Sequence, residues 1–305
     1  MKHFNDTRKV RCVMKKFKKV SAVVLSSVMV FSIAGCGKNV SGVSAEAQES
    51  KVAEASIKMK EAKSMKGNMQ MDVKMSAEGE TMDMTSVSDM VMFNDPLKMK
   101  MDMTTEVMGE KMTMQYYMQK NDNGTVDMYY GSDDLGWMKQ NVDMSYVEEL
   151  NGNADYYLKY AEDFESAGEE EINGETTEKF VGVIKAEDIN EVFENTNLDS
   201  LITSTGGDIS DVKKIFEGLE DIPMTIWISN ESGYPVQYDM DMTQLMQIVM
   251  DNTMAQYAEA SGEEIPEITI ENVKMLMNYG DFNEVDDFEV PADIIENAVE
   301  FNVQQ

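Results

Sequence analysis

The sequence predicts a single α+β domain built around an antiparallel β-meander with one apolar and one polar face. Three observations predict it. Apolar residues alternate with polar ones over much of residues 68–130, and short turn sequences interrupt the alternation. Before and after this region, apolar residues recur at spacings of three and four, which is typical of amphipathic helices. No shift in composition marks a domain boundary, so residues 51–305 are expected to form one domain.

The first 35 residues are expected to be a signal peptide that is removed. Residues 1–19 carry eight Lys and Arg and one acid, and "VSAVVLSSVMVFSIA" follows without a charge. A permanent transmembrane helix needs about 20 apolar residues, so this segment is too short for one. "MKKFKK" at Met14 is typical of the start of such signals, which leaves Met1 and Met14 open as the initiator.

The four residues "IAGC" resemble the lipobox of bacterial lipoproteins. The resemblance implies cleavage after Gly35 and a diacylglycerol group, bearing palmitate-like chains, on the Cys36 thiol. Two acyl chains hold a protein stably on a bilayer. We therefore expect a lipid anchor on the extracytoplasmic face of the bacterial cell membrane, followed by a flexible tether over residues 36–50.

Composition after Gly35 excludes several function classes. Eighteen Lys, no Arg and 56 acids remain, a net charge of −38 over 270 residues, which phosphate backbones would repel. The only His precedes Gly35, and no Cys follows Cys36. Disulfides, thiolate metal sites, His-activated nucleophiles and Arg clamps on phosphate are therefore excluded. We expect no enzymatic activity, no cofactor, no metal and no nucleic-acid partner.

The elements follow in order along the chain. A helix is predicted over residues 49–67, ending at Lys63, Lys66 and Gly67. Strands are predicted next, separated by the turn sequences "AEGE", "FNDP", "MGEK" and "NDNG". The strands cover residues 68–75, 81–93, 97–108, 111–119, 125–130 and 135–140.

The second half of the chain mixes helices and strands. Helical turns are predicted in 145–168 around Tyr156, Leu158, Tyr160 and Phe164, and helices over 208–220 and 244–260. Strands are predicted over 176–186 and 267–280, with a long hairpin over 222–242 that turns at Asn230–Gly233. A loop then returns to a short apolar segment at Phe288–Val290.

Two stretches resemble a known family. The hairpin "MTIWISNESGYPVQYDMDM" is similar to an element of LolA/LppX-like lipoproteins, and "YGDFNEVDDFEVPADIIENA" is similar to the closing segment of related Gram-positive lipoproteins of unknown function. The resemblance implies a strongly curved antiparallel β-sheet, an incomplete barrel, with helices covering its concave face. It also implies a cavity that holds acyl chains, so an apolar ligand is expected.

Thirty methionines raise the question of what this residue does here, since 14 of them fall between Met69 and Met118. Three interpretations stay open: a filled core, an adaptable wall around an apolar ligand, and thioether binding of Cu(I), for which Met82/Met84 and Met112/Met114 are candidate pairs. An adaptable ligand wall would explain why methionine is used where valine or isoleucine would suit a rigid strand better. The helices near 145–165 and 243–260 would cover it. Candidate pocket residues are Met71, Met84, Met101, Met114 and Ile226.

Two acidic loops, residues 121–127 and 279–289, contain oxygen ligands at short spacing. Neither matches the twelve-residue calcium loop that ends in Glu. Solvated turns are the interpretation we favour, because Asn, Asp and Gly also promote turns.

Overall fold

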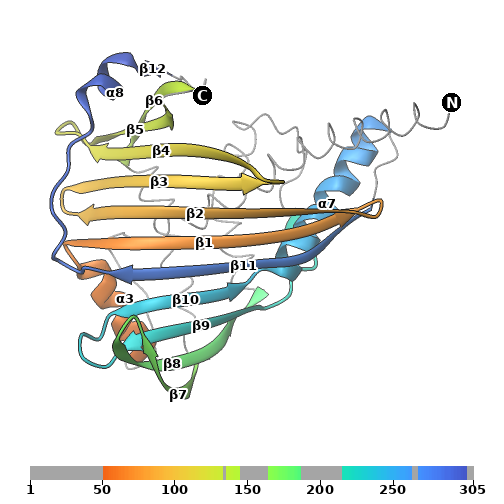
Figure 1. The fold of residues 1–305 in the computed structure, drawn as a ribbon, viewed down its shortest axis with the longest axis horizontal. Helices are drawn as coiled ribbons and strands as arrows, with labels where there is room; N and C mark the ends of the chain where they lie inside the picture. Colours follow the sequence, from red (N-terminus) through yellow and green to blue (C-terminus); the bar gives the residue numbers. More distant parts are fainter. Residues whose placement is uncertain (1–50, 133–134, 145–163, 187–214, 263–266, 301–305) are drawn as a thin grey trace.

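The computed structural model describes residues 51–132, 135–144, 164–186, 215–262 and 267–300. Its centre is an open, curved, twelve-stranded sheet in the order β12-β6-β5-β4-β3-β2-β1-β11-β10-β9-β8-β7 (Figure 1). All neighbours are antiparallel except β12, which pairs in parallel with β6. The sheet therefore consists of two meanders, one running from β1 to β6 and one from β7 to β11, which join where β11 pairs with β1.

The first meander contains the six long strands that were expected. Their bounds are β1 Ser64–Ala77, β2 Glu80–Asn94, β3 Leu97–Val107, β4 Glu110–Lys120, β5 Thr125–Ser132 and β6 Gly136–Asp143. The β1–β2 and β3–β4 turns place Glu78 and Gly79, and Met108 and Gly109, at positive φ. Positive φ at both central residues is the geometry that matches a tight turn to the twist of a hairpin.

The second meander and the helices complete the fold. The strands are β7 Glu165–Ile172, β8 Glu175–Ile184, β9 Ile222–Ser229, β10 Pro235–Asp241, β11 Ile268–Gly280 and β12 Val299–Glu300. The described helices are α3 Lys51–Glu61, α7 Thr243–Ser261 and α8 Ala292–Asn297. None of the described helices combines the length and apolar character needed to cross a membrane.

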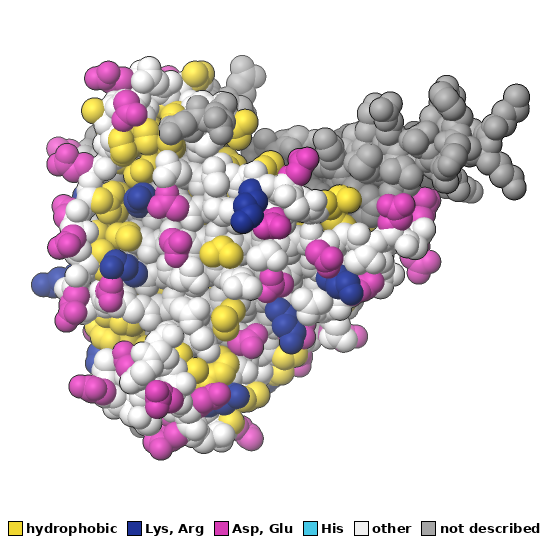
Figure 2. Space-filling model, in the orientation of Figure 1, with side chains coloured by type: hydrophobic (Ala, Val, Ile, Leu, Met, Phe, Trp, Pro, Cys, Tyr) yellow, Lys and Arg dark blue, Asp and Glu magenta, His cyan; other side chains and the backbone are white. Residues whose placement is uncertain are grey.

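One face of the sheet is apolar and buried, and we call it the inward face. Helix α7 packs on it at β11 and lies behind the sheet in Figure 1, while α3 packs at β9 and β10. The core joins Met71, Val73 and Met75 of β1 to Leu245 and Met246 of α7. The opposite, outward face carries interspersed Lys, Asp and Glu side chains (Figure 2). This alternation confirms the two-faced meander predicted from the sequence.

The outward face has its own small core, built by the end of the chain. Phe288, Val290 and Ile294 pack over β4, β5 and β6 against Tyr117 and Tyr129. The expected apolar segment at Phe288–Val290 is thus present. It covers the outward face rather than the inward one.

Two predicted helices extended too far. The first was expected to end at Gly67, but α3 ends at Glu61 and Lys66 and Gly67 lie in β1. The alternation from Met65 onward outweighs the helical spacing, because Met65 is buried opposite Met92 of β2. The second was expected to include residues up to 168, but residues 165–172 form the edge strand β7. β7 shows no alternation because nearly all its side chains are exposed.

Three further elements confirm the predictions, whereas residues 215–220, the described end of the predicted helix over 208–220, contain no α-helix. The hairpin of β9 and β10, helix α7 and strand β11 lie where they were expected. The helical turns around Tyr156, Leu158 and Tyr160, and most of the helix over 208–220, fall outside the described residues.

Candidate functional site

Methionines on the inward face form rows that run across the strands. One row joins Met65, Met92, Met99, Met118 and Met128, which are paired in register from β1 to β5. A second row joins Met224, Met240, Met275 and Met71, from β9 through β10 and β11 to β1. Opposed side chains on one face lie about 5 Å apart at Cβ, so neighbours within a row touch. Except for Met128, these side chains are buried.

Beside the first row, on strands β1 to β5, lies a partly accessible strip. Six of its side chains are neither buried nor fully exposed, and we call them the central strip: Met69, Met90, Met103, Met114, Tyr116 and Tyr130. Pairing of β1 to β5 places all six on the inward face. Met69 and Met90 pack against the edges of the buried cores, and the strip as a whole is a band of partly accessible apolar surface.

The two tyrosines of the central strip are neighbours on β4 and β5. Their rings stack with centroids 6.5 Å apart. Burial raises the pKa of Tyr116, and the adjacent Tyr130 raises it further. Burial likewise raises the pKa of Tyr130. Both phenols are therefore neutral at physiological pH, and they add apolar area together with a hydroxyl at the tip.

Three hydroxyl side chains interrupt the methionines on the inward face. Ser86 and Ser88 of β2 and Thr105 of β3 are all buried. The Ser86 and Thr105 hydroxyls lie 3.1 Å apart and hydrogen-bond to each other. Ser86 and Ser88 stand at inward positions of "TMDMTSVSDMVMF", and Thr105 at an inward position of "LKMKMDMTTEVM", but the prediction of an apolar face did not account for them.

The structure places all five candidate pocket residues on the inward face, but it does not bring them together. Met71, Met84 and Ile226 are buried in the main core, at 1%, 2% and 1% exposure. Met101 and Met114 lie on β3 and β4, diagonally across the strand pair. Of the five, Met114 alone belongs to the central strip. Whether any of them lines a pocket remains a prediction.

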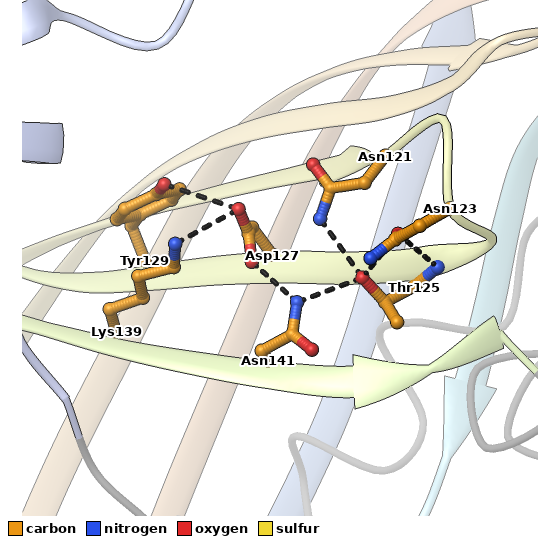
Figure 3. A network of polar contacts seen from close by, with 7 residues as sticks. All are labelled: Asn121, Asn123, Thr125, Asp127, Tyr129, Lys139 and Asn141. Carbon is orange, nitrogen blue, oxygen red and sulfur yellow. Dashed lines mark hydrogen bonds and ion pairs between the residues drawn. The ribbon is translucent and has the colours of Figure 1, made fainter.

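The first acidic loop forms a polar network on the outward face (Figure 3). Asn141 donates to Asp127 at 2.6 Å and to Thr125 at 2.9 Å, and the Lys139 ammonium lies 3.0 Å from Asp127. Burial alone would raise the pKa of Asp127, but the bonds from Asn141 and Lys139 hold it below its usual range. Lys139 and Asn141 thus engage the Asp127 carboxylate, which supports the interpretation as a structural turn.

Two acids of the second acidic loop are likewise paired with lysines. Lys66 lies 2.6 Å from Asp281, and Lys98 lies 2.6 Å from Asp287. In the described residues, no group of three His, Cys, Asp or Glu side chains is arranged to hold a metal ion.

A match to a family model identifies the family of this chain. The model described as "Family of unknown function (DUF6612)" matches residues 45–299. The chain belongs to this family. No curated protein matches the sequence.

Solved structures show distant similarity to this DUF6612 chain. The Mycobacterium tuberculosis lipoprotein LppX gives a TM-score of 0.42 at 12% identity, covering 81% of this chain and all of that one. LprF from Mycobacterium bovis gives 0.42 at 14% identity, covering 83% and 100%. A DUF1329 family protein from Desulfovibrio piger gives 0.27 at 9% identity, covering 84% and 98%. Similarity at this level does not bear on function.

Proposed function

We propose that this protein is an extracytoplasmic lipoprotein, anchored through Cys36, that binds or carries an apolar, lipid-like ligand and is not an enzyme. The central strip is the observation that carries the proposal. A protein whose only need is a filled core would bury Met69, Met103 and Met114 as completely as it buries Met71 and Met75. The strip instead leaves apolar side chains only partly buried on the inward face.

Methionine suits this role for a physical reason. It has three free torsions and a polarizable sulfur, so it reshapes around different apolar guests at little cost. Acyl chains that lie along the strip would bury Met and Tyr surface, which stabilises the complex by about 25 cal/mol per Å² of apolar area removed from water. Helices over the concave face of the sheet, as the family resemblance implies, would enclose the ligand.

Lipid extraction from the purified soluble domain, residues 37–305, tests this function. Native mass spectrometry is expected to show protein with an added lipid mass, and organic extraction is expected to release that lipid in near-equal molar amount. Replacing Met103 and Met114 together with Lys is expected to abolish the adduct, because two charges on the strip oppose burial of acyl chains. The matched control replaces Lys100 and Thr113, at outward positions of the same strands, with Met.

Two competing functions predict lipid-free protein, which is not what a lipid carrier would give, and a Cu(I) titration separates the two. A structural envelope lipoprotein with a filled, Met-rich core would appear as ligand-free protein. A Cu(I)-binding protein would also lack lipid but would release heat on anaerobic titration with Cu(I), a soft ion that suits thioether sulfur. Either result would overturn the lipid-carrier function.

The anchor is tested separately, in cells grown with radioactive palmitate. Cys36→Ser is expected to abolish labelling of the protein and to release it from the membrane, because the thiol is the proposed attachment site. Cys12→Ser, within the proposed signal peptide, is the matched control and is expected to leave labelling unchanged. Persistent labelling of Cys36→Ser would rule out the anchor.

A further inference from the structure

Within the part of the chain that the structure describes, the Ser88 hydroxyl is buried on the inward face without a hydrogen-bond partner. It lies in register between Met69 of β1 and Met103 of β3, both members of the central strip. Ser88 is 2% exposed, and its hydroxyl meets no donor or acceptor among the described residues. Buried hydroxyls are nearly always hydrogen-bonded, since leaving one unpaired in an apolar site is costly. A polar group of a bound ligand could therefore supply the hydrogen-bond partner that the Ser88 hydroxyl lacks.

The side chains around Ser88 determine which kind of ligand group could bond to its hydroxyl. The nearby hydroxyls of Ser86 and Thr105 bond to each other, and neither bonds to the Ser88 hydroxyl. The other inward side chains of β2, β3 and β4 are uncharged from Met82 to Met92, from Leu97 to Val107 and from Met112 to Met118. They are Met, Ser, Thr, Val, Leu and Tyr. A phosphate or carboxylate placed here would lose its hydration without gaining a cation, which is costly.

Building on the proposed function, we infer that Ser88 is a specificity-determining contact for an uncharged lipid that carries an ester carbonyl or a hydroxyl, an acylglycerol in chemical class. The Ser88 hydroxyl donates to an ester carbonyl or accepts from a ligand hydroxyl. Met69 and Met103 rotate aside to admit the ligand, and its acyl chains lie along the central strip. A plain hydrocarbon would bind the same strip but leave Ser88 unpaired.

Photolabelling of the full chain in dodecyl maltoside tests this inference. Three probes carry the same diazirine in an alkyl chain: a diacylglycerol, a phosphatidylglycerol and a long alkane. Intact mass and peptide mapping measure the label on β1 to β4. Ser88→Ala is expected to lower diacylglycerol labelling about fivefold, the loss of one neutral hydrogen bond, and to leave alkane labelling unchanged. Thr85→Val removes a hydroxyl from the outward face of the same strand, where it bonds to Asp72, and is the matched control.

Each outcome separates the subsite from the carrier function. Diacylglycerol labelling that exceeds phosphatidylglycerol labelling and falls only in Ser88→Ala supports the inference. Equal labelling of wild type and Ser88→Ala by diacylglycerol, or preference for phosphatidylglycerol, overturns the subsite and leaves an apolar carrier standing. If no probe labels β1 to β4 above a denatured control, both the subsite and the proposed function fail.

Discussion

Individual methionines take positions in β1 to β4 where branched residues would favour the extended chain more strongly. "LKMKMDM" places Met99, Met101 and Met103 on one face of β3, as its alternation predicted. The face of each residue followed from the sequence because side chains in a strand alternate with a period of two. Which methionines would be buried and which would form the central strip did not follow, since that depends on pairing across five strands.

At the same scale, the orphaned hydroxyl predicts an unusual stability change. Ser88→Ala is expected to raise the free energy of unfolding of ligand-free protein by about 1 kcal/mol, because it removes an unpaired buried polar group. Ser86→Ala, on the same face and equally buried, is expected to lower it by about 1 kcal/mol, because it deprives Thr105 of its partner. Urea denaturation measures both. Changes of the same sign would contradict the assignment of Ser88 as unpaired.

Whole elements were predicted best where the alternation was regular and least well where it was absent. The strands of the first meander were recognised from their methionines, whereas the Glu-rich β7 was not. β7 is ordered by pairing with β8, which is not visible in its local sequence. The destination of residues 288–294 was also hidden, because a short apolar segment can pack on either face of a sheet.

The C-terminal segment is expected to contribute to stability through α8. Ile294 is 4% exposed in the small outward core, and Ile295 beside it is 44% exposed. Ile294→Ala is expected to lower the free energy of unfolding by about 2 kcal/mol, at the low end for buried Ile because this core is small. Ile295→Ala is expected to change it by less than about 0.5 kcal/mol. Equal effects in urea denaturation would show that α8 is not docked as described.

The β5–β6 hairpin is expected to lose part of its stability in acid. The pKa of Asp127 is lowered in the fold, so its contribution is full above the unfolded pKa near 4 and is lost as pH falls through the lower folded value. Asp127→Asn is expected to cost about 1 kcal/mol at pH 7 and less at pH 3, measured by urea denaturation. Asp122→Asn, exposed in the adjacent turn, is the control. A cost that does not shrink at pH 3 would exclude the charge as its source.

Charge dominates the molecule as a whole. Residues 36–305 carry a net charge of −38, so their acidic side chains repel one another. Ion pairs with lysine, such as Lys74–Glu271 and Lys100–Asp102, involve only a few of these acids. Raising NaCl from 0.05 to 0.5 M is expected to raise the melting temperature by about 3 °C or more, because screening relieves repulsion in the folded state more than in the extended chain. A fall in melting temperature would show that ion pairs such as Lys139–Asp127 outweigh the repulsion.

Strand β11 has a consequence for the order of assembly. β11 pairs with β1 on one side and with β10 on the other, so it joins the two meanders. It spans Ile268–Gly280 and therefore follows ten of the other strands along the chain. In a chain that folds from its N-terminus, the first meander forms before β11 is available. Until then the backbone N–H and C=O groups on one edge of β1 have no strand to pair with. Until then α7 has no β11 to pack on, so the apolar face of the first meander stays open to contacts with other chains.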